Sequence, residues 1–134
     1  MEVNSTFGPI DIAVSGLRAQ SENIKLISSN VANARVTDNG SGEPYRRLEA
    51  IFRTDGDDIG GVSLDEISMD MSDFPMILKP GHPDADEHGY VAMPNVNLPI
   101  EMVNLNIASR AYQANAAILK RYQQMMETTL ELLR

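Results

Sequence analysis

The sequence contains no cysteine and no tryptophan, and aromatic residues make up only 5% of its 134 positions. The absence of cysteine excludes disulfides and thiolate chemistry, but it fits a reducing cytosol and an oxidising periplasm equally well. Few aromatic side chains argue against base-stacking surfaces, and a net charge of -8 would repel a phosphate backbone. We therefore expect no nucleic acid among the partners.

The chain also lacks the segments that direct proteins into membranes. Its first ten residues, MEVNSTFGPI, contain neither the basic region nor the apolar region of a signal peptide, and no stretch reaches the length of a membrane span. If the protein works outside the cytoplasm, we expect it to leave by a route that does not read a cleaved signal.

The most regular stretch is the last third, since Ile100 to Arg134 contains no glycine and no proline. Apolar residues recur there at three-four spacing from Met102 to Leu133, which is the seam pattern of a coiled coil. A second stripe one position earlier, including Ala108, widens the apolar face, so the helix needs more than one neighbour. The neighbours belong either to an ordinary bundle within the chain or to other chains. Asn97 and Pro99 mark the predicted start.

A second heptad helix is predicted near the amino terminus, roughly from Pro9 to Asn33, after Phe7-Gly8-Pro9. Gly16 lies inside it and costs about 1 kcal/mol relative to alanine, so either the helix is locally weak or a neighbouring backbone comes close. The cluster Ser28-Ser29-Asn30 favours a helix end, because short polar side chains compete for backbone groups.

The middle of the chain is acidic and rich in turns. Residues 35–98 carry five basic and thirteen acidic side chains, whereas residues 1–34 and 99–134 together carry six of each. The ends are suited to associate and the middle to remain solvated. Strands are predicted over 45–53, over 62–71 with a break near Asp65, and over 76–78 and 90–92, with a turn at 55–61.

These patterns predict an α+β fold in which two long terminal heptad helices pack as a coiled coil, with a small, mostly antiparallel β unit inserted between them. The expected divisions are 1–34 for the first helix, 35–98 for the acidic β-rich unit and 99–134 for the second helix. The middle unit has too few apolar residues to be very stable alone.

One cluster in the middle has residue types that bind metals, between His82 and His88. It resembles the opening of a calcium loop, but His88 stands where a carboxylate or amide ligand is needed, and Asn95 stands where the bidentate glutamate belongs. A solvated hairpin loop is the simpler interpretation. No nucleophile elbow, HExxH or phosphate loop is present, and Arg46-Arg47 is interpreted as a solvated strand edge. We expect no enzyme activity, no metal, no cofactor and no small-molecule substrate.

Several of these stretches together resemble a known family. They are SGLRAQ and SSNVANA in the first helix, PYRR, the run GHPDADEHGYVAMPNVN, and EMVNLNIASRAYQAN in the last helix. The matches are colinear, cover most of the chain and are similar to the flagellar rod and hook axial proteins, specifically those of the proximal rod. The chain has no room for the larger middle domains of distal-rod and hook proteins.

The resemblance implies a structural subunit of the basal-body rod, the shaft that crosses the periplasm and transmits motor torque to the hook and filament. It also implies export through the flagellar type III apparatus without a cleaved signal. The implied partners are other rod proteins, further copies of the chain, and membrane-ring and rod-junction proteins of the basal body. The residues expected to form the assembly interface are Ile10, Leu17, Ile24, Ile27, Val31, Met102, Leu105, Tyr112, Leu119, Met126, Leu130 and Leu133.

Two other functions are compatible with the residues alone. A soluble coiled-coil adaptor would use the same two helices in a closed dimer or tetramer, and would give a finite oligomer in sedimentation. A metal-dependent enzyme would use the cluster from His82 to His88, and would carry metal when purified.

Overall fold

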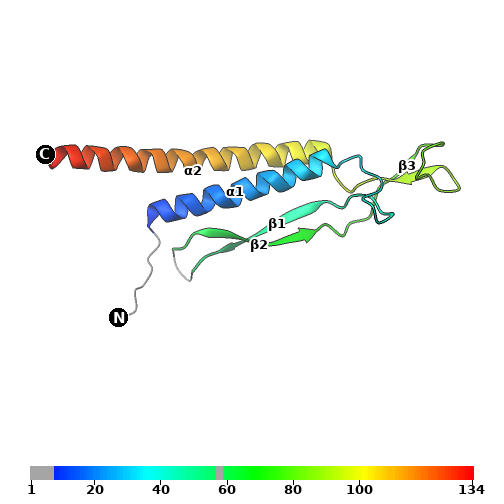
Figure 1. Cartoon of the computed structure of the whole chain (residues 1–134), viewed down its shortest axis with the longest axis horizontal. Coiled ribbons are helices and arrows are strands. Elements are labelled where there is room, and N and C mark those ends of the chain that lie inside the picture. Colours follow the sequence, from blue (N-terminus) through cyan, green and yellow to red (C-terminus); the bar gives the residue numbers. More distant parts are fainter. Residues whose placement is uncertain (1–7, 57–58) are drawn as a thin grey trace.

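Two antiparallel helices of unequal length run along an elongated molecule, for which a computed structural model describes residues 8–56 and 59–134 (Figure 1). Helix α1 spans Pro9–Ala32 and helix α2 spans Leu98–Leu132. Both helices were predicted from their heptads to within two residues of these ends. Neither is long and apolar enough, over the part of the chain described, to cross a membrane.

The helix starts follow from local chemistry. At α2, the side chain of Asn97 accepts a hydrogen bond from the backbone N–H of Ile100 at 3.2 Å, and Pro99 lies in the first turn, as predicted. At α1, the backbone N–H of Gly8 donates to the carboxylate of Asp11 at 3.1 Å. Phe7, the first residue of the predicted start of α1, lies outside the described residues.

Strands β1 (Leu48–Thr54) and β2 (Val62–Met69) form an antiparallel hairpin that lies along α1 (Figure 1). The break predicted near Asp65 is a β-bulge, because Ile51 pairs with Glu66 and Phe52 pairs with Leu64. The predicted turn at 55–61 includes residues 57 and 58, which are outside the described chain.

Strands β3 (Met76–Leu78) and β4 (Tyr90–Ala92) form a second antiparallel hairpin at the far end of the molecule from the carboxyl terminus (Figure 1). Both strands match their predicted bounds. The sequence predicted a single β unit, whereas the described residues, 8–56 and 59–134, form two separate two-stranded sheets. Val91 is fully buried and anchors the second hairpin.

Small residues allow the two helices to approach each other. Gly16 of α1 is buried, and Ala108 of α2 is 2% exposed and lines one cavity with Ile27 of α1. A Cβ atom built on Gly16 would lie 2.7 Å from Nδ2 of Asn115, so the two helices approach closely here. The close neighbour is a side chain and not the backbone. The α+β prediction, with terminal helices packed together and β structure between them, is confirmed.

Candidate assembly interface

The carboxyl-terminal part of α2 extends beyond the start of α1 (Figure 1). Gly16 lies against Asn115, and α1 begins about two turns before Gly16, so α1 covers α2 only as far as about residue 122. Burial agrees with this limit, because Tyr122 is half-buried and all residues 123–134 are exposed. We refer to residues 123–132 as the α2 extension.

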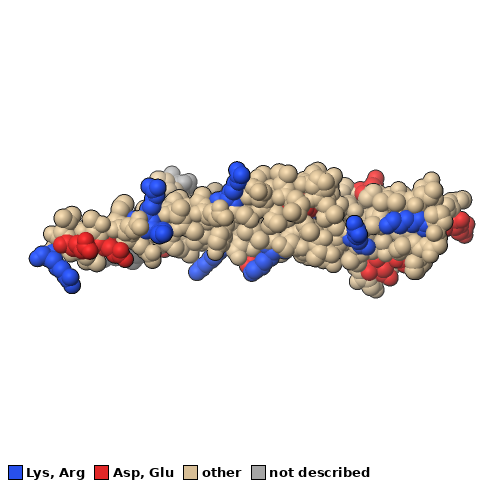
Figure 2. All heavy atoms as spheres, turned by 90° about the horizontal axis from the view of Figure 1, so that it is seen from above, with Lys and Arg blue, Asp and Glu red and all other residues tan. Residues whose placement is uncertain are grey.

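The α2 extension and the residue after it expose large apolar side chains to solvent. The exposed fractions are 63% for Met125, 49% for Met126, 63% for Leu130, 82% for Leu132 and 79% for Leu133. Contiguous apolar surface of this kind marks an interaction site, since monomers rarely expose it. Seen from the side of α2, charged side chains are scattered and uncharged residues form most of the surface (Figure 2).

The predicted interface residues divide between the two helices. On α1, Ile27 is buried and Leu17, Ile24 and Val31 are half-buried, whereas Ile10 is exposed. These α1 residues are therefore largely covered within the chain itself.

On α2, most members of the predicted set face solvent. Leu105 and Leu119 are half-buried, and the exposed members are Met102, Tyr112, Met126, Leu130 and Leu133. The residues closest to α1 come from the second stripe, which includes Ala108 and Asn115. The first stripe thus lies beside the contact with α1, where much of it is free to meet another neighbour.

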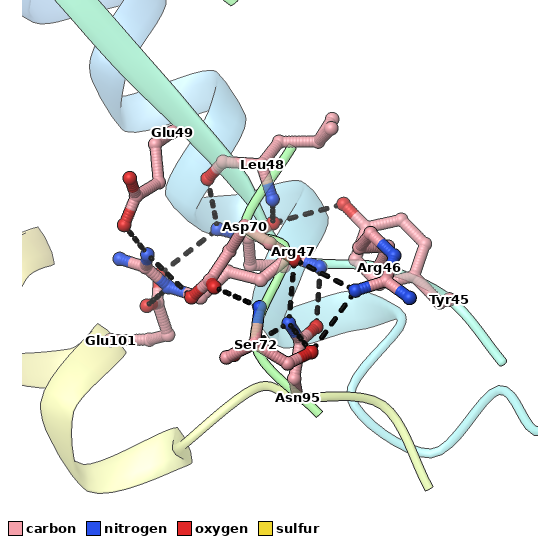
Figure 3. A network of polar contacts seen from close by, with 10 residues as sticks. Tyr45, Arg46, Arg47, Leu48, Glu49, Asp70, Ser72, Asn95 and Glu101 are labelled. Carbon is pink, nitrogen blue, oxygen red and sulfur yellow. Dashed lines mark hydrogen bonds and ion pairs between the residues drawn. The ribbon is translucent and has the colours of Figure 1, made fainter. Parts of the chain in front are cut away.

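At the opposite end of α1, a polar junction joins both helices to the β1–β2 hairpin (Figure 3). Asn30, which is 1% exposed, donates through Nδ2 to the carbonyl of Leu48 and accepts at Oδ1 from the Leu48 backbone N–H, each at 2.9 Å. Its side chain therefore pairs with β1 as a strand would. The hydroxyl of Tyr45 also donates to Asn30 Oδ1 at 2.9 Å.

Glu101 of α2 is fully buried at the centre of this junction. Its Oε1 accepts from Nε of Arg47 at 2.6 Å, and its Oε2 accepts from Nδ2 of Asn30 at 3.2 Å. Arg47 also pairs with Glu49, and with Oδ2 of Asp70 at 3.7 Å (Figure 3). Burial disfavours the charged form of Arg47 and by itself would lower its pKa. The hydrogen bonds to Glu101 and Glu49 have the larger combined effect, so the pKa of Arg47 is raised.

Two residues that follow strands complete the junction: Asp70, directly after β2, and Asn95, shortly after β4. The backbone N–H of Arg47 donates to Oδ1 of Asn95 at 2.8 Å, and Nδ2 of Asn95 donates to the carbonyl of Asp70 at 2.9 Å. The backbone N–H of Ser72 donates to Oδ1 of Asp70 at 2.9 Å. This bond is the main reason why the pKa of Asp70 lies below its ordinary value.

The interpretation of Arg46-Arg47 as a solvated strand edge was wrong. The side chain of Arg47 is only 18% exposed because it pairs with Glu101. Arg46 donates to the carbonyls of Asp70 and Ser72, each at 3.0 Å, and its guanidinium lies 4.2 Å from the ring centre of Phe74. β1 begins at Leu48, three residues later than predicted.

Ser28-Ser29-Asn30 does lie close to the end of α1, which runs on to Ala32. The sequence did not show, however, that Asn30 has a partner on β1. Glu101 was the available signal for the junction. A carboxylate on the apolar part of a helix needs a partner elsewhere in the chain, because buried charges are rarely left unpaired.

The loop from His82 to His88 uses its polar groups to shape turns. Oδ1 of Asp86 accepts from the backbone N–H of Tyr90 at 2.8 Å and of His88 at 2.9 Å, and the first of these bonds lowers the pKa of Asp86. Asp84 accepts from the hydroxyl of Thr37 at 2.7 Å. Within residues 8–56 and 59–134, no group of three His, Asp or Glu side chains is arranged to hold a metal ion.

A groove of about 540 Å³ lies between α1 and the β1–β2 hairpin. Ser15 of α1 lines this groove, and a serine hydroxyl can act as a nucleophile. Its Oγ, however, donates to the carbonyl of Ile12 at 2.7 Å and accepts from the backbone N–H of Val62 at 3.0 Å. Ser15 therefore attaches the hairpin to α1, next to the close approach at Gly61.

Comparison with known proteins identifies the family of the chain. A family model described as "Flagella basal body rod protein" matches residues 10–39, and one described as "Flagellar basal body rod FlgEFG protein C-terminal" matches residues 87–132. The flagellar basal-body rod protein FlgC of Salmonella typhimurium is 42% identical over 125 residues, which cover 91% of this chain and 93% of the relative. The chain belongs to the FlgC family.

Relatives from two other bacteria give the same result. FlgC of Agrobacterium fabrum is 39% identical over 127 residues, which cover 92% of this chain and 91% of the relative. FlgC of Borreliella burgdorferi is 37% identical over 147 aligned positions, which cover 95% of this chain and 97% of the relative. The resemblance to rod proteins inferred from the sequence is thereby confirmed, and the two family models fall mainly on α1 and on α2 with β4.

Proposed function

We propose that this FlgC-family chain is a structural subunit of the proximal rod of the flagellar basal body and enters it through the exposed stripe of α2. The observation that carries the proposal is the α2 extension, whose apolar residues Met126 and Leu130 are 49% and 63% exposed. Burying them would be favourable, at roughly 25 cal/mol per Å² of apolar surface removed from water.

The position of the α2 extension supports an open assembly. It lies at one end of the elongated chain, and the β3–β4 hairpin lies at the other (Figure 1). A contact between different surfaces of successive subunits is heterologous, and it continues into a filament or tube unless the rotation closes a ring. Other rod proteins and further copies of the chain are the neighbours that such a surface would receive.

The distribution of charge supports an orientation in which the helices face the inside of the rod and residues 35–98 face the outside. All of the net charge of -8 falls in residues 35–98, while residues 1–34 and 99–134 together are neutral. We propose that these three segments act as an outer acidic unit and two inner helical parts. Helices without net charge can approach copies of themselves without strong repulsion, and an acidic unit remains solvated.

The finer parts of the proposal concern place and partners. The chain would be exported by the flagellar type III apparatus without a cleaved signal, join the periplasmic part of the rod, and meet membrane-ring and rod-junction proteins of the basal body. It would transmit motor torque towards the hook and filament without catalysing a reaction.

The experiment compares two variants that each add one carboxylate to the α2 extension. Leu130→Asp changes the apolar stripe, whereas Gln124→Asp changes the polar face of the same helical turns. Each is produced in a strain lacking the protein, its export is measured, and rod completion and swimming are scored. We expect Leu130→Asp to be exported but to leave rods incomplete, because an unpaired carboxylate in an apolar interface costs several kcal/mol.

Gln124→Asp should support normal swimming. If Leu130→Asp also swims normally, the α2 extension is not the assembly surface. Sedimentation of the purified chain then distinguishes the soluble adaptor, because a closed dimer or tetramer would stop growing with concentration.

A further inference from the structure

Two contacts fix how α1 and α2 lie along each other. Asn30 meets Glu101 at 3.2 Å, and Gly16 lies against Asn115. The two α1 residues are fourteen positions apart, and so are the two α2 residues. Fourteen residues are two heptads, so both contacts lie on one antiparallel seam.

The rest of this seam does not by itself select one alignment. Between the two contacts, Ala108 is buried and small, and Asn23, Ile27 and Asn104 line one cavity with it. Small side chains next to a cavity can face one another in several alignments. The apolar stripes of both helices repeat every seven residues, so sliding α2 by one heptad keeps apolar side chains in contact. Apolar packing is non-directional, which makes it a weak source of register.

The polar junction has no equivalent in a slipped alignment. Sliding α2 by one heptad in one direction would place Asn30 opposite Ala108, and would leave Glu101 beyond the end of α1 without the amide that it accepts from. Sliding it the other way would place Asn30 beyond the start of α2 and would place Glu101 opposite Asn23, about 10 Å away from Arg47. A buried carboxylate without its arginine is strongly disfavoured, so only one alignment gives Glu101 both of its donors.

We propose that Asn30 and Glu101, held by Arg47, are positioning residues that select a single register of the helix pair. The same side chain of Asn30 pairs with both backbone groups of Leu48, so the register of the helices is also tied to the start of β1. A buried asparagine that sets alignment at some cost in stability is an established device in coiled coils.

The register determines how far α2 projects beyond α1. A slip of one heptad would move the α2 extension by about 10 Å relative to the β1–β2 hairpin, at 1.5 Å per residue. For assembly this consequence rests on the proposed function, because a neighbouring subunit can bind the extension in one place only if every copy projects it equally. The register itself is a property of the single chain.

The absence of cysteine permits a direct measurement. Cysteines introduced at Ser28 and Ala117, which are both exposed, accept spin labels whose separation is measured by pulsed dipolar spectroscopy. In the described register these sites are about fourteen residues apart along the seam, or roughly 21 Å along the helix axes. A heptad slip changes that axial separation by about 10 Å in either direction.

The test variant is Asn30→Leu with Glu101→Leu, which replaces the polar pair by apolar side chains and keeps the helix-forming pattern. The matched control is Ser21→Leu with Ser109→Leu. Both control serines are half-buried on the same two helices, and neither belongs to the polar junction. Circular dichroism is measured on each labelled protein.

We expect one distance in the unmodified background and in the control, and additional distances displaced by about 10 Å in the Asn30/Glu101 variant, with helicity retained. A single native distance in that variant would overturn the proposal, because the remaining seam would then set the register. Loss of its helicity would also overturn it, because the junction would be needed for folding and not for choosing an alignment. Neither outcome depends on rod assembly, so the proposed function is tested separately by Leu130→Asp.

Discussion

Nε of Arg47 lies 2.6 Å from Oε1 of Glu101, across fifty-four positions of sequence. The glutamate is fully buried and the arginine side chain is 18% exposed, so the carboxylate depends on protein donors and has no access to water. This ion pair joins the first turn of α2 to the residue that precedes β1. Breaking it by removing one partner should therefore be more damaging than removing a surface pair.

Glu101→Ala should lower the free energy of unfolding by about 3 kcal/mol, at the lower end of the range for broken buried pairs because Arg47 keeps Glu49 and Asp70. Glu127→Ala, an exposed glutamate on the same helix, is the matched control and should change stability by less than about 0.5 kcal/mol. Urea unfolding followed by circular dichroism measures both. Equal effects of the two substitutions would contradict the role assigned to Glu101.

Asp70 makes part of the stability dependent on acid. Its pKa is lowered in the folded protein, chiefly by the backbone hydrogen bond from Ser72, so it binds its proton less readily than in the unfolded chain. Its contribution is present above the unfolded pKa of about 3.9 and is lost as the pH falls through the folded value. Asp70→Asn should thus be less stable than the parent at pH 7, and the difference should disappear in acid. A difference that is unchanged between pH 7 and pH 2 would argue against this.

Repeating patterns made the helices and short strands predictable. Heptads from Met102 to Leu133 and the capping residue Asn97 defined α2, and the glycine and proline residues around 76–78 and 90–92 bounded β3 and β4. Each of these signals acts over a few neighbouring residues, so the sequence contains it directly. The bulge at Asp65 was located for the same reason, as a local break in alternation.

The polar junction could not be predicted in the same way. Asn30 and Glu101 are seventy-one positions apart, and the heptad spacing of each helix alone does not show that they meet. Asn30 taken alone resembles a residue that ends a helix, and Arg47 taken alone resembles a solvated charge. Asn30 and Arg47 both meet Glu101 only because the start of β1 is placed beside the two helices. That placement follows from the whole fold and not from local propensity.

The close approach at Gly16 can be tested with a double-mutant cycle. Gly16→Ala gains about 1 kcal/mol of helix propensity, but its Cβ would displace the side chain of Asn115 from its bond to the Ala111 carbonyl, so the net change should be near zero. In an Asn115→Ala background the obstacle is absent, and Gly16→Ala should stabilise by about 1 kcal/mol. Thermal unfolding of the four proteins gives the coupling. The same effect of Gly16→Ala in both backgrounds would rule out a contact between these positions.

Two leucines on one stripe should separate folding from assembly. Leu119 is half-buried and lies level with the first turns of α1, whereas Leu130 is 63% exposed beyond α1. Leu119→Asp should destabilise the isolated chain by about 1 to 2 kcal/mol, and Leu130→Asp by less than about 0.5 kcal/mol. Both should fail to complete rods. If Leu130→Asp lowers the stability of the monomer as much as Leu119→Asp, the extension is covered by its own chain in solution.

The α2 extension should be the least protected part of α2 in the dilute monomer. Residues 123–132 are all exposed, and a helical segment of this length without tertiary burial is marginal in water. Hydrogen exchange followed by mass spectrometry should show rapid exchange of its amides, while residues 101–115 of the same helix remain protected by α1. In assembled rods the extension should become protected, because its apolar stripe is then buried against a neighbour. Equal protection of 123–132 and 101–115 in the dilute monomer would mean that the extension is stable without a neighbour, and ordering on assembly would then contribute nothing to rod growth.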